Sequence, residues 1–310
     1  MENTRAKTTR NSLILLLTAT IWGMAFVSQS KGMDYMHPFT FNGVRSLIGA
    51  AGILVYILIS RKIAGDKAAK LDWKLNVRAG LLCGIFLTIA STLQQFGIKY
   101  TSVGKAGFIT TLYIIFVPMF GVFLKKKVAP VVGAAAGMAA VGMYLLCMTE
   151  SLRLGAGDIM VFLCAIAFAI QIMTVDHYAA RIDGAVVSCI QFTVCGVVCC
   201  IGALIWGQPT FGQIQEGLGA LLYAGVLSCG VGYTLQIVGQ KGLNPTVAAL
   251  IMSLESVIAT ISGWIAYKIG FLSTDQTLTP RQIAGCVIVF AAVILVQLPP
   301  EWFRFGKKND

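Results

Sequence analysis

Residues 235–263 read LQIVGQKGLNPTVAALIMSLESVIATISG, and they decide the fold because an earlier stretch repeats them. Residues 93–121 read LQQFGIKYTSVGKAGFITTLYIIFVPMFG, and a shift of 142 positions aligns eight identical residues over 29 positions. Composition alone would give roughly two or three identities. Glu255 then falls opposite Tyr113, so one helical unit occurs twice and only its second copy carries a charge at the centre.

The composition around these two stretches is that of a membrane protein. Of 310 residues, 57% are hydrophobic and only 12% are charged, and the mean hydropathy is +0.79. A soluble chain of this size cannot cover so much apolar surface with so little charge. The net charge of +11 comes from Lys and Arg residues between apolar runs, which indicates membrane topology rather than nucleic-acid binding.

Ten apolar runs are long enough to cross a bilayer. They lie near residues 12–30, 39–59, 79–99, 105–124, 128–147, 158–175, 185–206, 217–239, 245–267 and 281–298. We predict an all-α polytopic membrane protein with ten transmembrane helices, divided into five-helix repeats at residues 1–150 and 151–310. Because five is odd, the second repeat enters the membrane from the opposite face. Inverted repeats of this kind are a recurring architecture of secondary transporters.

The basic residues between the runs predict the orientation. Seventeen of them fall on one side of the alternating connections and six on the other, with Arg45 inside a run. Positively charged loops stay in the cytoplasm. We therefore expect a multi-pass protein of the cytoplasmic membrane with both termini in the cytoplasm.

Glu255 is the first candidate for a functional group, because a carboxylate near the middle of a span is costly to bury. It could bind a cationic group of a substrate, or carry a coupling proton if burial favours its neutral form. The alternative is a structural carboxylate that is satisfied by hydroxyl groups or by a basic side chain between helices.

Arg45 is the basic residue that lies well inside a span, and its guanidinium offers five donors that need acceptors. It could bind a substrate carboxylate, pair with Glu255, or extend to the nearby membrane surface. Four further candidates for substrate or coupling-ion binding are polar or aromatic: Trp22, Gln94, Tyr113 and Gln236. Such groups orient a solute in a cavity, although they also hold helices together.

Other kinds of chemistry find little support. Asp176 and His177 end a span together, which leaves an intramembrane enzyme as an alternative, but no hydrolase or zinc-protease motif accompanies them. The nine cysteines lack metal-ligand spacing with the two histidines, so we expect them to be small core residues. We expect no catalytic residue, no metal and no cofactor.

With these residues in view, the chain resembles the EamA-like family of the drug/metabolite transporter superfamily. The resemblance is carried by Trp22-Gly23, by PFTFNGVR at residues 38–45, by LQQFGIKYTSVGKAGFITTLYIIFVP at 93–118 and by LNPTVAALIMSLESVIATISGW at 243–264. The family implies ten helices in two inverted repeats around a central cavity, lined by the first, third, fourth, sixth, eighth and ninth helices. It also implies the export or exchange of small metabolites, often amino acids.

We therefore predict a secondary transporter that moves small metabolites such as amino acids across the cytoplasmic membrane by alternating access. A flippase for a lipid-linked carrier is the alternative within transport. The expected partners are a small-molecule substrate and the lipid bilayer, with no nucleic acid. Coupling to protons is left open, as is the choice between a monomer and a homodimer.

Overall fold

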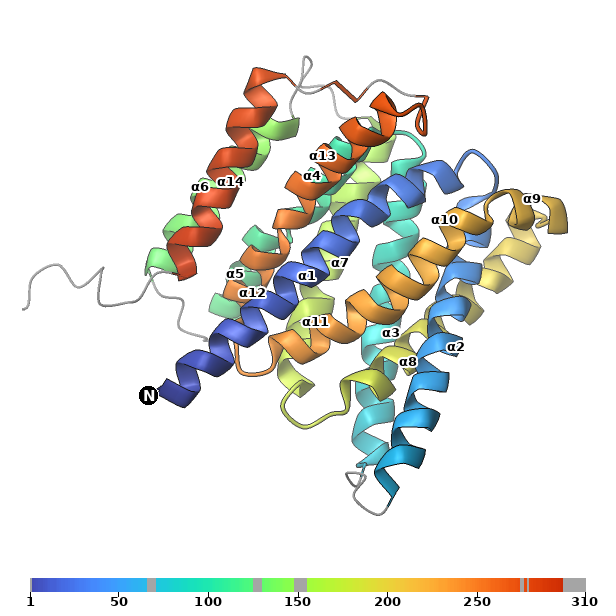
Figure 1. Ribbon diagram of the computed structural model, residues 1–310, viewed down its shortest axis with the longest axis horizontal. Coiled ribbons are helices and arrows are strands. Elements are labelled where there is room, and N and C mark those ends of the chain that lie inside the picture. Colours follow the sequence, from blue (N-terminus) through green and yellow to red (C-terminus); the bar gives the residue numbers. More distant parts are fainter. Residues whose placement is uncertain are drawn as a thin grey trace, which may run out of the picture.

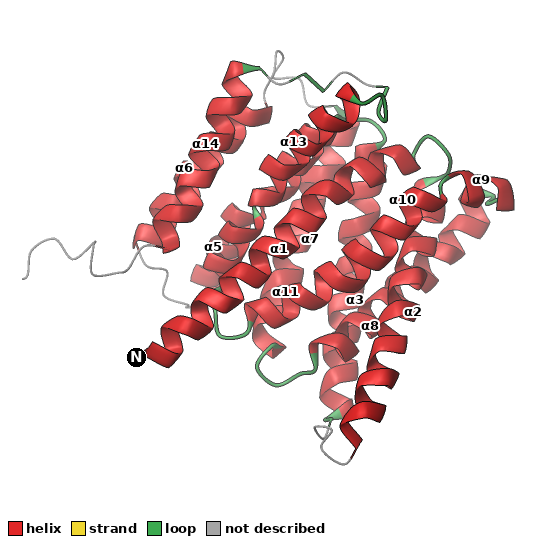
Figure 2. Ribbon diagram, viewed as in Figure 1, coloured by secondary structure: helices red, strands yellow, loops and turns green. Residues whose placement is uncertain are grey.

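Helices account for most of the chain in the computed structural model, which describes residues 2–65, 71–124, 130–147, 155–273, 276–277 and 279–297. The helices form one inclined bundle joined by short loops at its two ends, and no strand occurs in the described residues (Figures 1 and 2). The elements are α1 (Glu2–Gly32), α2 (Pro38–Ala64), α3 (Trp73–Ile98), α4 (Val103–Thr111), α5 (Tyr113–Phe123), α6 (Pro130–Cys147), α7 (Ala156–Tyr178), α8 (Gly184–Gly202), the π-helix η2 (Ala203–Gly207), α9 (Phe211–Glu216), α10 (Leu218–Leu222), the π-helix η3 (Tyr223–Gly232), α11 (Tyr233–Gln240), α12 (Pro245–Met252), α13 (Leu254–Lys268) and α14 (Pro280–Gln297).

Eight helical stretches among the described residues are long and apolar enough to cross a membrane. They coincide with the first four predicted spans and with the sixth to the ninth, so the prediction of a polytopic helical membrane protein is confirmed. The fifth and tenth predicted spans match two shorter apolar helices, Pro130–Gly142 and Pro280–Leu295. The ends of those two runs, at 128–129 and 298, lie outside the described residues, and a total of ten spans stays a prediction.

Local capping chemistry sets several helix starts. The Asp72 carboxylate accepts a backbone N–H in the first turn of α3, and the Asp183 carboxylate accepts two in the first turn of α8. Asn244 caps α12 in the same way, and Pro245 follows it at the first helical position, where its missing N–H costs nothing. These residues fix where the chain turns at one end of the bundle, since Asp72, Asp183 and the nearby Lys241 line the same hollow there.

The fourth and ninth spans are each interrupted near the middle, which the apolar pattern did not predict. α4 gives way to α5 at Leu112, and α12 gives way to α13 at Ser253. After the first interruption, Pro118 lies inside α5, where it cannot donate a backbone N–H to the carbonyl of Ile114. At the second, the hydroxyls of Ser253 and Ser256 bond to carbonyls three residues earlier, a contact that competes with the helical backbone bonds.

The eighth span is also irregular, because the ten-residue π-helix η3 separates α10 from α11. Its glycines allow a close approach by α2. A Cβ added at Gly49 of α2 would lie 2.7 Å from the Cβ of Cys229 and 2.9 Å from the carbonyl oxygen of Gly225. π-Helical turns inside spans are frequent at functional sites, which directs attention to the residues that η3 presents to the interior.

Helices α6 and α14 lie side by side along one edge of the bundle (Figure 1). Gly142 makes this contact close, since an added Cβ would lie 2.9 Å from the Gly285 carbonyl oxygen and 2.9 Å from the Val289 nitrogen. Gly137, on the same helix, has no atom within 4 Å of the corresponding position. The two glycines therefore differ in packing while sharing one helix.

We expect Gly142→Leu to lower the thermal stability of the protein in detergent, because the new side chain collides with backbone that cannot move away. Overpacking of this kind costs about 1–3 kcal/mol or more. Gly137→Leu is the matched control and is expected to unfold at the wild-type temperature, since its side chain enters open space. Equal unfolding temperatures for the two variants, measured by the loss of monodisperse protein on heating, would contradict the packing described above.

Candidate functional site

A central cavity lies among the spans. The centre of a water molecule can reach only about 30 Å³ of it. That is room for one or two waters, so the helices must separate before a larger solute fits. The lining residues are Trp22, Phe26, Gln29, Arg45, Ser46, Leu87, Ser91, Gln94, Thr110, Tyr113, Phe168, Gln171, Ile172, Phe192, Ser228, Cys229, Tyr233, Gln236 and Glu255.

Tyr113 and Glu255 meet inside this cavity. The Tyr113 hydroxyl donates a hydrogen bond of 3.0 Å to Oε1 of Glu255, and both side chains are buried. Tyr113 is the first residue of α5 and Glu255 the second of α13, so each follows directly on a helix interruption. Their separation of 142 residues equals the shift that relates the two sequence repeats, so matching positions of the repeats touch each other.

The two charged candidates share the cavity without forming an ion pair. No Lys, Arg or His nitrogen of the described residues forms a salt bridge with Glu255, and the two salt bridges that occur there lie elsewhere. Arg45 is buried, with its Nε lacking a hydrogen-bond partner in the structure. Its guanidinium carbon lies 5.4 Å from the centre of the Phe41 ring. The cavity thus offers a carboxyl group and a separate guanidinium.

Aromatic rings occupy the region between α1, α8 and α11. The Trp22 and Tyr233 ring centres are 4.5 Å apart, and Phe192 meets Tyr233 edge to face at 4.9 Å. The Trp22 indole nitrogen also lies 3.4 Å from the carbonyl oxygen of Ser228, in η3. Rings of this kind attract a cationic group when it is held over their faces, so they complement the carboxyl group of Glu255.

Glutamine side chains complete the polar lining. Gln171 and Gln236 face each other, with Nε2 of Gln236 donating to Oε1 of Gln171 at 3.2 Å. Gln94 donates to the Thr110 hydroxyl at 3.1 Å. These bonds satisfy the amides in the present conformation, and the same groups can exchange partners with a polar solute.

The structure brings all six sequence candidates together around the one cavity. Glu255, Arg45, Tyr113, Gln94, Gln236 and Trp22 each contribute to its lining, although their roles stay predictions. The cavity also draws residues from the second and seventh spans, Arg45 and Phe192, whereas the resemblance named six other helices.

Some features of the cavity were not predicted from the sequence. Phe168 and Phe192 carry no signal, because an aromatic residue in an apolar run usually faces lipid or core. The helix interruptions could have been suspected from the clustered hydroxyl residues near Thr110 and Ser253, and η3 from its glycines. Asp176 and His177 lie at the end of α7 and are not among the cavity residues.

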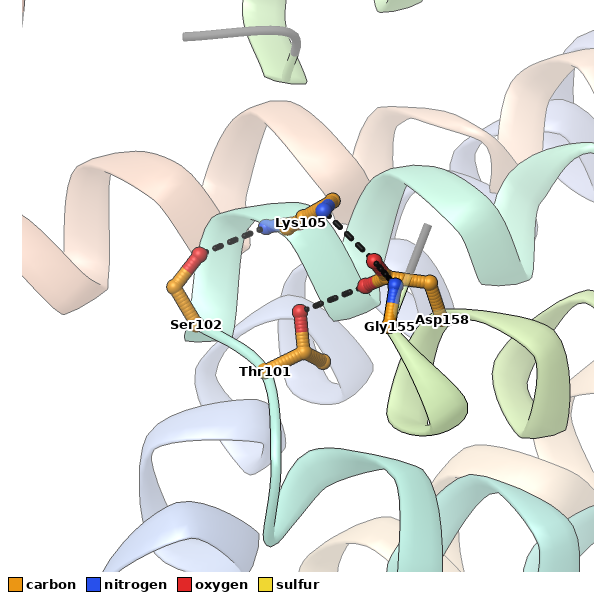
Figure 3. Close-up of polar contacts among 5 residues, drawn as sticks. All are labelled: Thr101, Ser102, Lys105, Gly155 and Asp158. Carbon is orange, nitrogen blue, oxygen red and sulfur yellow. Dashed lines mark hydrogen bonds and ion pairs between the residues drawn. The ribbon is translucent and has the colours of Figure 1, made fainter. Parts of the chain in front are cut away.

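The starts of α4 and α7 are joined by a buried polar cluster (Figure 3). Nζ of Lys105 lies 2.6 Å from Oδ2 of Asp158, whose side chain is only 4% exposed. Asp158 also accepts bonds from the Thr101 hydroxyl and the Gly155 backbone N–H, both at 2.9 Å. Because the carboxylate is fully partnered, this cluster holds two cavity-lining spans together at one end of the bundle.

We expect Lys105→Met to destabilise the protein by about 2 kcal/mol or more, because it leaves the Asp158 carboxylate buried without its cation. The pair between Lys31 and Asp34 is the control, since its lysine is exposed as much as Lys105 is but its carboxylate is half exposed. Lys31→Met should cost less than about 1 kcal/mol. The measurement is the denaturation midpoint of each variant in detergent. Similar losses of stability in both variants would contradict the conclusion that the cluster holds α4 and α7 together.

The chain is similar in sequence to a family of transporters. The sequence model of the EamA-like transporter family matches residues 10–148 and again residues 155–298. An uncharacterized transporter of Archaeoglobus fulgidus is 28% identical over 92% of this chain and 84% of its own length. An uncharacterized transporter of Clostridium kluyveri is 22% identical, covering 91% of each chain, and the uncharacterized transporter YoaV of Bacillus subtilis is 20% identical over 95% of this chain and 97% of its own.

A crystal structure of another protein shares the fold. It superimposes with a TM-score of 0.73 over 96% of this chain and 99% of that chain, at 16% sequence identity. At that identity the likeness concerns the arrangement of the helices alone.

Proposed function

Since this chain belongs to the EamA-like transporter family, we propose that it is a secondary transporter that moves small metabolites such as amino acids across the cytoplasmic membrane. The observation that carries this proposal is the central cavity, where Glu255 and Tyr113 bond across the two interrupted helices. Interrupted helices near the midplane are typical of substrate and ion sites in secondary transporters.

Alternating access would follow from two inverted five-helix repeats, at residues 1–150 and 151–310. The packing of the helices supports this arrangement. The contact of α3 with α7, between the third and sixth spans, matches the contact of η3 and α11 with α1, between the eighth and first spans. The contact of α4 with α7, between the fourth and sixth spans, matches that of α13 with α1, between the ninth and first spans. α2 packs on α8 and α6 on α14, and each of these is a pair of matching spans. Such reciprocal contacts are expected of a two-fold relation.

Close glycine contacts repeat in the same way. A Cβ added at Gly97 would lie 2.8 Å from the Gly157 carbonyl oxygen, and one added at Gly239 would lie 2.7 Å from the Leu15 side chain. Gly97 matches Gly239, and Leu15 matches Gly157, under the shift of 142 positions that relates the repeats. The same pair of surfaces thus packs twice.

An amino acid suits the chemistry of the cavity. Its carboxylate can replace water at the Arg45 guanidinium, a planar donor fork that fits a carboxylate. Its ammonium group can be held by Glu255 and by the Trp22 and Tyr233 rings. One solute would then engage both charged groups, which the structure keeps apart.

Proton coupling would use Glu255. A carboxylate buried without a cation costs several kcal/mol, and no basic side chain of the described residues forms a salt bridge with Glu255. Opening to one side and then to the other would let the group release and take up a proton in turn. The distribution of Lys and Arg predicts that both termini lie in the cytoplasm. The starts of α4 and α7, which the Lys105–Asp158 cluster joins, would then lie on the extracytoplasmic side.

The test is uptake into proteoliposomes of labelled amino acids and nucleosides, with and without an imposed pH gradient. We expect uptake of one or more amino acids, stimulated by the gradient. Absence of flux for every solute, with protein that is folded and correctly inserted, would refute the proposal and favour the lipid flippase.

A further inference from the structure

A second cavity system lies on the flank of the bundle, between α2 and the eighth span. Its first part is an apolar groove in which the centre of a water-sized molecule can occupy about 420 Å³. Gly52 opens it, since no atom lies within 4 Å of the place where a Cβ would be. The lining residues are Gly49, Gly52, Ile53, Tyr56, Val226, Gly230, Val231, Thr234, Leu235 and Val238.

The second part is a polar vestibule where α2, α7 and α11 end. The centre of a water-sized molecule can occupy about 600 Å³ of the vestibule. Three basic side chains line it, Arg61, Arg181 and Lys241. The two carboxylates there, of Asp72 and Asp183, accept backbone N–H groups at the starts of α3 and α8. Three basic and two acidic side chains leave the vestibule an excess of one positive charge. Lys241 and Arg181 donate to the backbone carbonyl oxygens of Ile182 and His177 in this conformation.

The groove and the vestibule are continuous, because Tyr56, Thr234 and Val238 line both. From Gly49 to Arg61, α2 rises about 18 Å. Half of the hydrocarbon core of a bilayer is about 15 Å thick. The system therefore runs from near the middle of the membrane to one surface, which is the reach of a single lipid in one leaflet.

We propose that this groove and vestibule bind an anionic phospholipid, with an acyl chain along α2 and η3 and the phosphate among Arg61, Arg181 and Lys241. Basic pockets between transmembrane helices recognise anionic head groups in this way. Tyr56, at the junction, is suited to the interface between acyl chain and head group.

The lipid would lie outside the central cavity, since the groove and the cavity share no lining residue. One layer separates them at the contact between Gly49 and Cys229, where Cys229 lines the central cavity. A lipid wedged beside η3 would thus support the wall of the cavity without entering it. The inference depends on the membrane location of the chain and not on its substrate.

Native mass spectrometry of the full-length protein, titrated with phosphatidylglycerol or with phosphatidylcholine of the same chain length, tests the proposal. The wild type should bind phosphatidylglycerol more tightly. Arg181→Gln with Lys241→Gln should weaken phosphatidylglycerol binding by about 25-fold, taking about fivefold for each charge, and leave phosphatidylcholine unaffected. Gly52→Phe should weaken the binding of both lipids, because the ring fills the groove.

Two matched controls separate this site from general attraction to lipid. Gly133→Phe on α6 adds the same ring where, as at Gly52, no atom lies within 4 Å. Lys7→Gln with Arg10→Gln removes two exposed charges from α1. Both controls should bind as the wild type does. Wild-type binding by Gly52→Phe would show an anion site without an acyl chain, and equal losses in the controls would show unspecific attraction; either result overturns the proposal. Neither bears on whether the protein transports a solute.

Discussion

Glu255→Gln is expected to abolish the response of uptake to a pH gradient and to lower uptake by about 100-fold, in protein that still folds. The amide keeps the shape of the side chain and can still accept the hydrogen bond from Tyr113, which is 3.0 Å long. It cannot take up or release a proton at neutral pH, and it loses the charge that would bind an ammonium group. Loss of one charged hydrogen bond costs about 1.5–3 kcal/mol, or 10-fold to more than 100-fold.

Glu216→Gln is the matched control for this experiment, because Glu216 is exposed at the end of α9, outside the cavity. Its uptake and its response to the gradient should equal those of the wild type. The measurement is the initial rate in proteoliposomes at equal protein content, with and without the gradient. Unchanged kinetics in Glu255→Gln would remove the residue from the mechanism.

Arg45→Gln is expected to remove the preference of the protein for solutes that carry a carboxylate. The reason is the buried guanidinium, which lines the central cavity and whose Nε has no hydrogen-bond partner in the structure. We expect the KM of an amino acid to rise about 10-fold to 100-fold, as for other hydrogen bonds to charged groups. The KM of the corresponding decarboxylated amine should change little.

Arg45→Lys adds a second arm to this experiment, because it keeps the charge and loses the planar fork. An intermediate KM is expected. If Arg45 serves only to hold α2 in place, Arg45→Gln would lower thermal stability and affect the amino acid and the amine equally. Arg78→Gln is the matched control, because Arg78 is exposed on α3. It should leave the KM of the amino acid and the KM of the amine unchanged.

The sequence predicted the helical membrane fold, because that fold follows from a coarse pattern, whereas the contact between Tyr113 and Glu255 was not predicted. Apolar runs of bilayer length report spans directly. The shift of 142 positions placed Tyr113 opposite Glu255, and the two side chains are hydrogen-bonded. A charge inside an apolar run was a reliable guide to the cavity, since Glu255 and Arg45 both line it.

Backbone irregularity escaped prediction because hydropathy averages over whole turns. The interruptions at Leu112 and Ser253 each involve a single residue, with hydroxyl bonds to the backbone nearby, and such local features change the mean hydropathy of a span very little. The glycines of η3 are a weak signal, because glycine is also frequent in regular transmembrane helices. Whether Arg45 would pair with Glu255 was also open, since two side chains on different spans have no fixed distance in a sequence.

The contact between α6 and α14 has a consequence for biosynthesis. Gly142 packs against Val289, and the two residues are separated by almost half of the chain. At about 5–20 residues per second, a ribosome needs roughly 7–30 s to make the intervening segment. During that interval α6 has a face shaped for a helix that does not yet exist. Other contacts therefore have to cover this face before the chain itself can do so.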